Sequence, residues 1–494
     1  MVSGRVKHFV VKMFWISYPG YVSKTFRTCD LDQPFLLPPS LQDWLPENHL
    51  ARFVAELANG LDLSEIYRFY GRRDGRGMAA YHPVMMVRLL LYGYCVGVMS
   101  SRRIERATFD DLAFRYLAAD QHPDHDSIAE FRKQHLPVLA ELFTQVLQLC
   151  GKAGLVKLGH VAIDGTKLQA NASKHKAMSY GRMEEKEKQL KAEVEKLLAQ
   201  AAEIDAAEDK LHGKGMRGDE LSGELARRES RLKKIAEAKA ALEQEAREHA
   251  EAAKKAAEEK LEERRKKEEE RGKKLGGRPP QVLDPEQARP EATAQRNFTD
   301  PESRIMPDSG RKGSFVQGYN AQIAVDSKAQ IIVAAEITQQ TNDKQQLAPM
   351  LIQVEQNMSA RPEAVTADTG YFSENQINDE RLKGIDLYVA TGKQQHAQPD
   401  ADDVIQPGTP PVESDSAMEK MKQKLQTETG RAIYKMRKAI VEPVFGQIKA
   451  ARGIRAFLLR GLEKTQAEWK LICATHNLLK LFRASRAGRQ TQLA

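Results

Sequence analysis

The spacing of hydrophobic residues changes along the chain, and in the N-terminal part it is typical of helices. Between residues 35 and 155, apolar residues recur every three or four positions, most clearly over residues 41–61 and 83–98. This period predicts amphipathic or buried helices. Pro83 suits the first turn of such a helix, because the amide hydrogen that proline lacks has no partner there. We therefore predict an all-helical N-terminal part over residues 35–155.

From residue 156 onward, short apolar runs that are typical of β-strands appear. Residues 156–164 form one run that ends on Asp164, and residues 315–325 and 331–337 predict a hairpin. Further along, the pattern predicts a helix over 343–357, a strand over 364–368, a helix from Ser373, a strand over 386–390 and helical structure over 434–483. Without the insertion described next, this order is β-β-β-α-β-α-β-α. It predicts an α/β, ribonuclease-H-like core with a mixed sheet flanked by helices.

Residues 182–275 interrupt the strands with a segment made mostly of Lys, Glu, Ala and Arg. Leu190, Leu197, Ile204 and Leu211 are seven residues apart, which predicts a coiled coil. The glycine-rich stretch 212–218 predicts that two helices fold back on each other. Two interpretations stay open. The segment is an arm that contacts a second copy or DNA, or it is a solvated spacer, which the decay of the hydrophobic seam after residue 242 favours.

These changes of pattern predict a division of the chain into seven segments. They are a poorly ordered N-terminal extension (1–34), a helical DNA-binding domain (35–155), the first part of the catalytic core (156–181), the helical coiled-coil insertion (182–275), a linker rich in Gly, Pro and Gln (276–298), the remainder of the core (299–483) and a tail (484–494).

Composition narrows the class of protein only a little. The 494 residues carry a formal net charge of +8, which is compatible with a nucleic-acid partner but is shared by many other proteins. No run of 18 apolar residues is present, so we expect no membrane span. The four cysteines lie far apart without a CxxC pair, which argues against a zinc site or a disulfide framework and favours a reducing cytoplasm.

Three carboxylates occupy the positions at which this element order would bring acids together. Asp164 ends the first predicted strand, Asp368 ends the fourth, and Glu442 lies on the last helical segment. Hydrolysis and transfer of phosphodiesters with two metal ions needs about three such acids, and hard ions such as Mg²⁺ prefer oxygen ligands. A lone aspartate at a strand end is usually only a turn former. Because all three acids are placed as one fold requires, we predict that they bind two Mg²⁺ or Mn²⁺ ions.

Basic residues accompany the third acid. Tyr434, Lys438, Glu442 and Lys449 are separated by steps of four, four and seven residues, which would keep them on one face of a helix. A carboxylate among cations can bind metal while the cations hold phosphate. In the N-terminal part, Arg102, Arg103 and Arg132 are candidates for contacts with the DNA backbone. Short helices with arginines between them suit a helix-turn-helix-like unit, and a bundle with solvated arginines is the alternative.

Several motifs together resemble bacterial insertion-sequence transposases of the DDE superfamily, the group with a Tyr-Arg-Glu-Lys signature on the last catalytic helix. The resemblance covers most of the chain from about residue 35. The motifs that carry it are Tyr81-His82-Pro83, residues 123–127, the stretch from Asp164 to Ser173, residues 299–304, Gly318-Tyr319-Asn320-Ala321-Gln322, Asp368-Thr369-Gly370-Tyr371, and the tail from Glu442 to Leu478.

The resemblance implies that Asp164, Asp368 and Glu442 bind the catalytic metal ions and that Tyr434, Arg437 and Lys449 contact DNA or phosphate. This sequence departs from the signature, which has three residues between Arg and Glu. Arg437 has four residues before Glu442, whereas Lys438 has three, so either can fill the arginine role. The resemblance also implies a dimer or higher synaptic complex that binds terminal inverted repeats and target DNA. A general ribonuclease-H-like nuclease and a DNA-binding or regulatory copy without catalysis are the alternatives.

Overall fold

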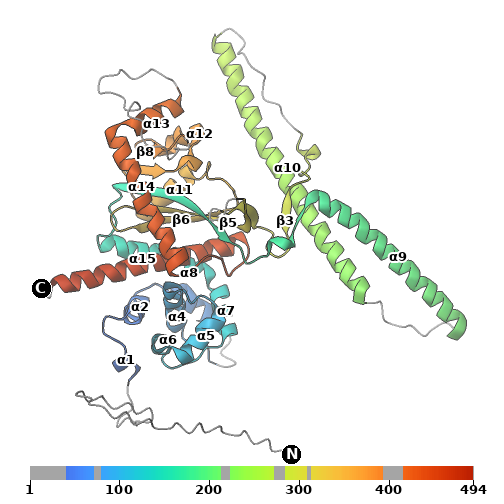
Figure 1. The fold of residues 1–494 in the computed structure, drawn as a ribbon, viewed down its shortest axis with the longest axis horizontal. Coiled ribbons are helices and arrows are strands. Elements are labelled where there is room, and N and C mark those ends of the chain that lie inside the picture. Colours follow the sequence, from blue (N-terminus) through green and yellow to red (C-terminus); the bar gives the residue numbers. More distant parts are fainter. Residues whose placement is uncertain are drawn as a thin grey trace, which may run out of the picture. The chain divides into compact units, whose positions relative to one another are not determined.

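The structure is a computed structural model that describes residues 40–71, 79–212, 223–271, 284–308, 313–392 and 416–492 (Figure 1). The chain divides into two compact units, Met1–Trp44 and Leu45–Ala494. The described part of the first unit contains one helix, α1 (Leu41–Trp44). The predicted N-terminal extension and nearly all of the glycine-rich stretch lie outside the described residues.

The described residues between Leu45 and Ala153 contain helices and no strand, as the hydrophobic spacing predicts. The helices are α2 (Leu50–Asn59), α3 (Ser64–Gly71), α4 (Pro83–Val96), α5 (Ser101–Asp110), α6 (Leu112–Leu117), α7 (His125–Gln134) and α8 (Leu136–Lys152). Pro83 begins α4, as predicted, and nearly every side chain of α4 is buried. Among the described helices, none alone is apolar enough over a sufficient length to span a membrane, and α4 and α5, which are bent by 97°, reach that length and apolar composition only when taken together.

One mixed sheet forms the centre of the second unit. Its strands are β1 (His160–Gln169), β4 (Arg304–Pro307), β5 (Phe315–Asp326), β6 (Ile331–Thr338), β7 (Ala364–Ala367) and β8 (Asp386–Val389). They run in the order β4-β5-β1-β7-β8, and β6 also pairs with β5. The strand β5 is antiparallel to β1 and β6, whereas β1, β7 and β8 are parallel. The predicted hairpin and the two later strands are confirmed.

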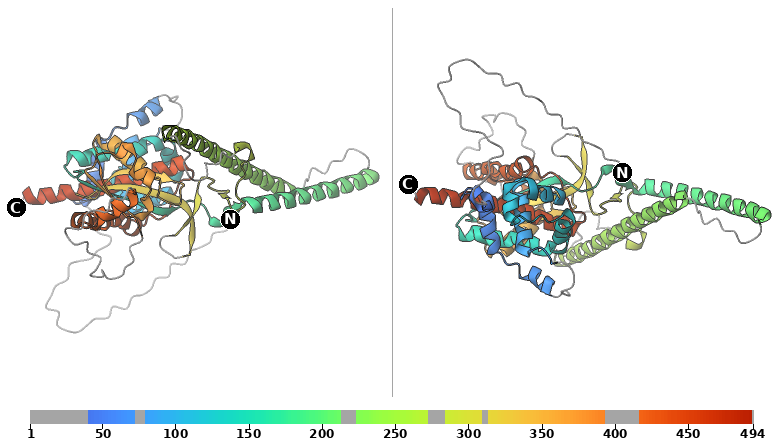
Figure 2. Two further views of the ribbon diagram at one scale, coloured as in Figure 1. Left: turned by 90° about the horizontal axis from the view of Figure 1, so that it is seen from above. Right: turned by 90° about the horizontal axis from the view of Figure 1, so that it is seen from below.

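Helices surround this sheet, as the views from above and below show (Figure 2). The helix α11 (Leu347–Met358) packs on β5 and β6, and α14 (Glu428–Gly446) packs on β1, β5 and β7. The long helix α15 (Leu462–Gln492) packs on β6, α8 and α4. Side chains of the N-terminal helices and of the sheet therefore belong to one continuous hydrophobic core.

The first strand differs from its prediction. It begins at His160 instead of 156 and continues to Gln169, so Asp164 lies in the middle of β1 and does not end it. Gly165, the next residue, also lies within the strand. A Cβ atom there would overlap the Gln322 amide and lie 3.0 Å from Asn320 Oδ1 and Asp343 Oδ1. Glycine is needed at this position because polar side chains approach the backbone closely.

The predicted helical segment over 434–483 is interrupted. The helix α14 is followed by a π-helical turn at Gln447–Ala451 and by an extended stretch, and α15 begins only at Leu462. Gly453 and Gly461 have φ angles of 69° and 87°. This left-handed backbone is accessible to glycine and unfavourable for other residues, which explains why the helix does not run through. The hydrophobic spacing alone did not reveal the break.

The outer edge of β6 is closed by side chains instead of a further strand. Asn477 of α15 accepts a hydrogen bond from the Ile332 amide and donates one to the Ile332 carbonyl, both at 2.8 Å. Gln466 does the same for the Ile337 amide and the Ala335 carbonyl. An open edge strand offers unpaired backbone groups to other chains, so these amides replace a neighbouring strand.

We expect Asn477→Leu to lower the free energy of unfolding by about 3 kcal/mol, because two buried backbone groups of Ile332 lose their partners at roughly 1–3 kcal/mol each. Asn477 is fully buried. Urea unfolding of the full chain measures the change. The control is Asn342→Ala at an exposed position, for which the expected change is within about 0.5 kcal/mol. An equally small change in Asn477→Leu would contradict this account of the β6 edge.

The insertion forms two long helices, α9 (Tyr180–His212) and α10 (Gly223–Arg271). At its base a short sheet joins β2 (Ala177–Ser179) to β3 (Gln295–Asn297). There Tyr180, Met183, Leu190, Ile235, Ala238 and Leu242 form a small core that is separate from the main one. Of the residues whose spacing predicts the coiled coil, Leu190 is buried and Leu197 is only half-buried, and the side chains of Ile204 and Leu211 lie outside the described residues.

Candidate active site

Two aspartates lie side by side on neighbouring strands of the sheet. The parallel strands β1 and β7 pair His160 with Ala364 and Ala162 with Thr366. The same offset aligns Asp164 with Asp368, the residue that follows β7. Because adjacent strands are about 4.8 Å apart, this register brings the two carboxylates to one place. Asp368 also accepts a hydrogen bond from the Gly370 amide at 2.9 Å, which fixes the turn after β7.

The buried guanidinium of Arg437, on α14, balances these two charges. Its Nη1 donates to Asp164 Oδ2 at 3.1 Å, and both side chains are mostly buried. Tyr434, one turn earlier, stacks near the guanidinium, whose Cζ is 5.9 Å from the ring centre. Lys438 is exposed at the next position. The structure therefore places Arg437, and not Lys438, against the acid of β1.

Burial makes both aspartates hard to ionise. Burial raises the pKa of Asp164 to about 6, which the neighbouring Arg437 opposes and the charge of Asp368 reinforces. Burial also raises the pKa of Asp368, again against the effect of Arg437. Carboxylates whose ionised form is destabilised in this way gain from a cation that replaces the lost water.

A third carboxylate at this centre, Asp343, was missed by the sequence reasoning. It follows β6 and accepts hydrogen bonds from the amides of Asn320 and Gln322, the latter at 2.6 Å. Its charge raises the pKa of Asp164 and of Asp368. In the sequence Asp343 was only the first residue of a predicted helix, which begins at Leu347 instead. The available signal was its position between the predicted strand over 331–337 and the helix that follows.

Lys167 and Tyr371 complete the surroundings of the three aspartates. Lys167 Nζ lies 3.7 Å from Asp343 Oδ1, and both side chains are largely buried. The hydroxyl of Tyr371 donates to Gln322 Oε1, and burial together with the three aspartates raises its pKa well above the usual value. Tyr371 is therefore a neutral hydrogen-bond donor that holds Gln322, and it is not a base.

Glu442, the predicted third acid, is not part of this arrangement. It lies on the exposed side of α14, five residues after Arg437. Within the described ranges, no three or more His, Cys, Asp or Glu side chains are arranged to hold a metal ion. The donor atoms at Asp164 and Asp368 nevertheless fit a hard divalent cation, since they are carboxylate oxygens on β1 and directly after its parallel neighbour β7. Asn320 Oδ1, buried near Gly165, also has no hydrogen-bond partner.

The other predicted contact residues occupy three different environments. Arg102 and Arg103 are exposed on α5, where a DNA backbone could reach them. Lys449 is partly buried and donates to Thr166 Oγ1 and to the Lys167 carbonyl, the latter at 3.0 Å, so it fastens the π-helical turn to β1. Burial lowers the pKa of Lys449.

The position of Arg132 corrects its predicted role. Its side chain is 7% exposed and donates to the Met99 carbonyl at 3.0 Å. It also contacts the hydroxyl of Tyr94, which donates to the buried Glu468 of α15. Arg132 therefore ties α7 to α4 and offsets a buried carboxylate, and it is not available to a DNA backbone in this conformation.

Two segments of the chain match known protein families. Residues 39–134 match the family described as Transposase domain (DUF772), and residues 298–478 match the family described as Transposase DDE domain. The second match contains Asp343, Asp368, Arg437 and Glu442, whereas Asp164 precedes it on β1. The helices α9 and α10 lie between the two matches. No curated protein and no solved structure matches the chain.

Proposed function

Because the chain belongs to the insertion-sequence DDE transposases, we propose that it binds the terminal inverted repeats of its own element, cleaves the DNA there and joins the ends to target DNA. Enzymes of this family perform metal-dependent phosphodiester chemistry. The observation that carries the proposal for this chain is the pair Asp164, on β1, and Asp368, directly after the parallel neighbour β7, with Arg437 in contact with Asp164 and its charge acting on both.

Asp164 and Asp368 are the residues that would hold two divalent ions, Mg²⁺ or Mn²⁺. Glu442 lies outside their arrangement in this structure, and its place as the ligand that would complete one of the two sites rests on the sequence. When bound, such ions lower the pKa of an attacking water and stabilise the leaving oxygen. The chain keeps Asp164 oriented through the Arg437 contact and keeps Asp368 oriented through the Gly370 amide. Asp343 is a positioning residue, because it holds Asn320 and Gln322 beside Gly165.

The reaction needs no covalent link to the protein. In the first step, water oxygen bonds to phosphorus at the end of the element and the P–O3′ bond breaks. The water proton leaves to solvent, and the departing 3′ oxygen becomes a hydroxyl. In the second step, this 3′ hydroxyl oxygen attacks a phosphodiester of the target, whose own 3′ oxygen leaves. Arg437 and Tyr434 stand beside the acids and would contact the reacting phosphate.

Recognition of the ends is assigned to the helical segment 35–155. Arg102 and Arg103 on the exposed side of α5 suit contacts with the phosphate backbone, and Lys438 on α14 suits a contact closer to the acids. Two ends must be held together for joining, so we propose a homodimer or a higher synaptic complex on double-stranded DNA. An enzyme with this function would act in the bacterial cytoplasm, at the nucleoid.

The third acid is the part of the proposal that needs the first experiment, because Glu442 is exposed and Asp343 is not. With Mg²⁺ and a labelled duplex that carries the terminal repeat, we expect Glu442→Gln to bind the duplex and to lose cleavage. We expect Asp343→Asn to slow cleavage by about 10–100-fold, as loss of an outer partner of a metal site does.

Two results would change the assignment. Cleavage retained in Glu442→Gln and lost in Asp343→Asn would make Asp343 the third acid. Binding without cleavage by the unaltered protein would indicate a DNA-binding copy without catalysis. A general nuclease would show little preference for the repeat over unrelated DNA, so competition with an unrelated duplex separates that alternative.

A further inference from the structure

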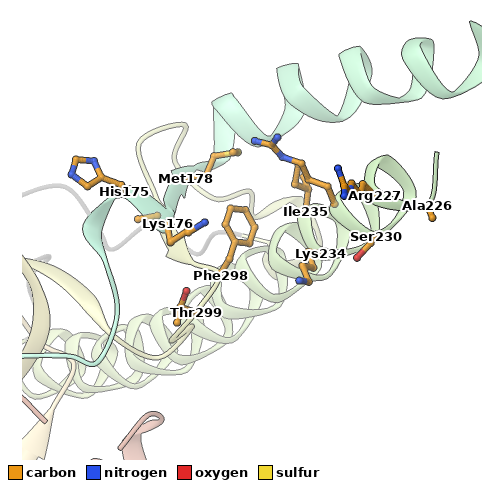
Figure 3. Close-up of a pocket in the computed structure, with 12 residues that line it drawn as sticks. His175, Lys176, Met178, Ala226, Arg227, Ser230, Lys234, Ile235, Phe298 and Thr299 are labelled. Carbon is orange, nitrogen blue, oxygen red and sulfur yellow. The ribbon is translucent and has the colours of Figure 1, made fainter. Parts of the chain in front are cut away.

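A pocket lies at the base of the helical insertion, away from the aspartates. It has a volume of about 710 Å³ and lies between the segment His175–Met178, the first turns of α10, and Phe298 and Thr299 (Figure 3). Figure 3 shows Lys176 and Phe298 on one side and Lys234 and Ile235 of α10 on the other. This space exceeds that of one small anion, so it suits a longer stretch of an extended ligand.

The lining of this pocket is basic. It includes Lys176, Arg227, Arg231, Lys234 and His175, and no Asp or Glu. Arg227, Ser230, Arg231 and Lys234 follow one another by steps of three, one and three residues, which places them on one face of α10. Ser230 and Thr299 add hydroxyl groups. Like charges at this spacing repel each other within a helix, so the stripe costs stability unless an anion lies against it.

Cations outside the pocket, at the base of the insertion, are paired differently from the cations that line it. Toward α9, Arg228 pairs with Glu193 at 2.9 Å and Lys239 pairs with Glu187 at 3.3 Å. Near β3, Arg296 and Arg304 both pair with Glu245. In the pocket, by contrast, Arg227, Arg231 and Lys234 make no salt bridge to any described residue. Arg228, Lys239, Arg296 and Arg304 thus have acidic partners near this pocket, whereas the three cations that line it have none among the described residues.

The apolar part of the pocket lining is formed by Phe298, Met178 and Ile235. All three belong to, or pack against, the small core at the base of the insertion. The Phe298 amide also donates to the Lys176 carbonyl at 3.1 Å, which joins the two chain segments that form the side of the pocket opposite α10. The cations therefore project from an ordered junction that connects the insertion to the strand β4 and the sheet.

We propose that this pocket is a second DNA contact of the transposase, in which Lys176, Arg227, Arg231 and Lys234 bind phosphates of the double-stranded backbone. The inference rests on the proposed function, because it takes the DNA that the enzyme cleaves as its ligand. The contact is independent of sequence, since cations on phosphates carry no information about bases. Of the two interpretations of the insertion, an arm that contacts DNA then applies, and a solvated spacer does not.

Salt dependence of DNA binding by the full chain tests the assignment. For Arg227→Ala/Arg231→Ala/Lys234→Ala, we expect weaker binding of both a repeat-bearing and an unrelated duplex. We expect the slope of log K against log salt to fall by about 2–3, because each lost phosphate contact removes about 0.9. The matched control is Lys233→Ala/Lys255→Ala/Lys260→Ala, which removes the same charge from the same helix outside the pocket. Alanine preserves helix propensity in both.

An unchanged slope in the pocket variant, or an equal fall in the control, would overturn the proposal. Loss of self-association with unchanged DNA binding would also overturn it, since the pocket would then bind an acidic segment of a second copy. These outcomes are separate from a failure of the proposed function. An unaltered protein that does not prefer the terminal repeat would refute end recognition while leaving the difference in slope intact.

Discussion

Replacing Asp164 by Asn is expected to abolish cleavage of the element ends while leaving DNA binding unchanged. The carboxylate lies in the middle of β1, beside Asp368 on the parallel neighbour, and both would hold the divalent ions. Loss of an outer partner of a metal site costs about 10–100-fold, so loss of a direct ligand is expected to cost more than about 100-fold. Single-turnover cleavage of a labelled repeat duplex with Mg²⁺ measures the change.

The stability of this variant shows whether the fold is intact. The pKa of Asp164 is about 6 in the folded chain against an ordinary value of 3.8. The folded state therefore binds this proton more tightly, and Asp164 lowers the stability progressively as the pH rises from about 4 through 6. Relative to the unaltered protein, Asp164→Asn should become more stable between pH 4 and pH 8 by roughly 3 kcal/mol, since one pKa unit is worth about 1.4 kcal/mol.

Two results would contradict this prediction. Cleavage within a factor of a few of the unaltered rate would remove Asp164 from the catalytic centre. A stability difference that does not change with pH would mean that Asp164 is solvated and not buried as the structure shows. Because the first readout concerns chemistry and the second concerns folding, an unfolded variant cannot imitate the expected pair of results.

Replacing Arg437 by Ala is expected to have the second large effect, this time on stability. Its guanidinium is the charge that opposes the burial of both Asp164 and Asp368. Breaking a buried ion pair by removal of one partner costs roughly 3–5 kcal/mol, because the remaining charges are left without compensation. This cost should be small at pH 5, where the aspartates can bind protons, and should grow as the pH rises past about 6.

Urea unfolding at pH 5 and pH 8 measures the effect of Arg437→Ala, and Lys438→Ala is the matched control. Lys438 is the next residue on α14 and is exposed, so its removal should change stability by less than about 0.5 kcal/mol at both pH values. Addition of Mg²⁺ at pH 8 should restore part of the stability that Arg437→Ala loses, because a divalent ion supplies the missing positive charge. Equal losses in the two variants would contradict the assigned contact.

The sequence by itself predicted five of the six strands of the core in their order, all but β4, and the interruption of that core by long helices. Both follow from local spacing, since a strand alternates faces every two residues and a helix repeats every 3.6. It also placed Asp368 at the end of the strand predicted over 364–368, which in the structure ends one residue earlier, at Ala367. The sequence also contained the motifs that resemble those of DDE transposases, and both family matches are to transposase domains.

Only the tertiary structure decided which side chains meet. The register of β1 against β7 set Asp164 beside Asp368, and the buried face of α14 selected Arg437 over Lys438. In the folded chain, Asp343 lies beside Asp164 and Asp368, Arg132 is buried in the interior, and Glu442 is exposed. The local pattern gives the face of each element but not its neighbours. Those depend on strand register, on helix rotation and on close approaches such as the one at Gly165, which arise only when distant segments pack together.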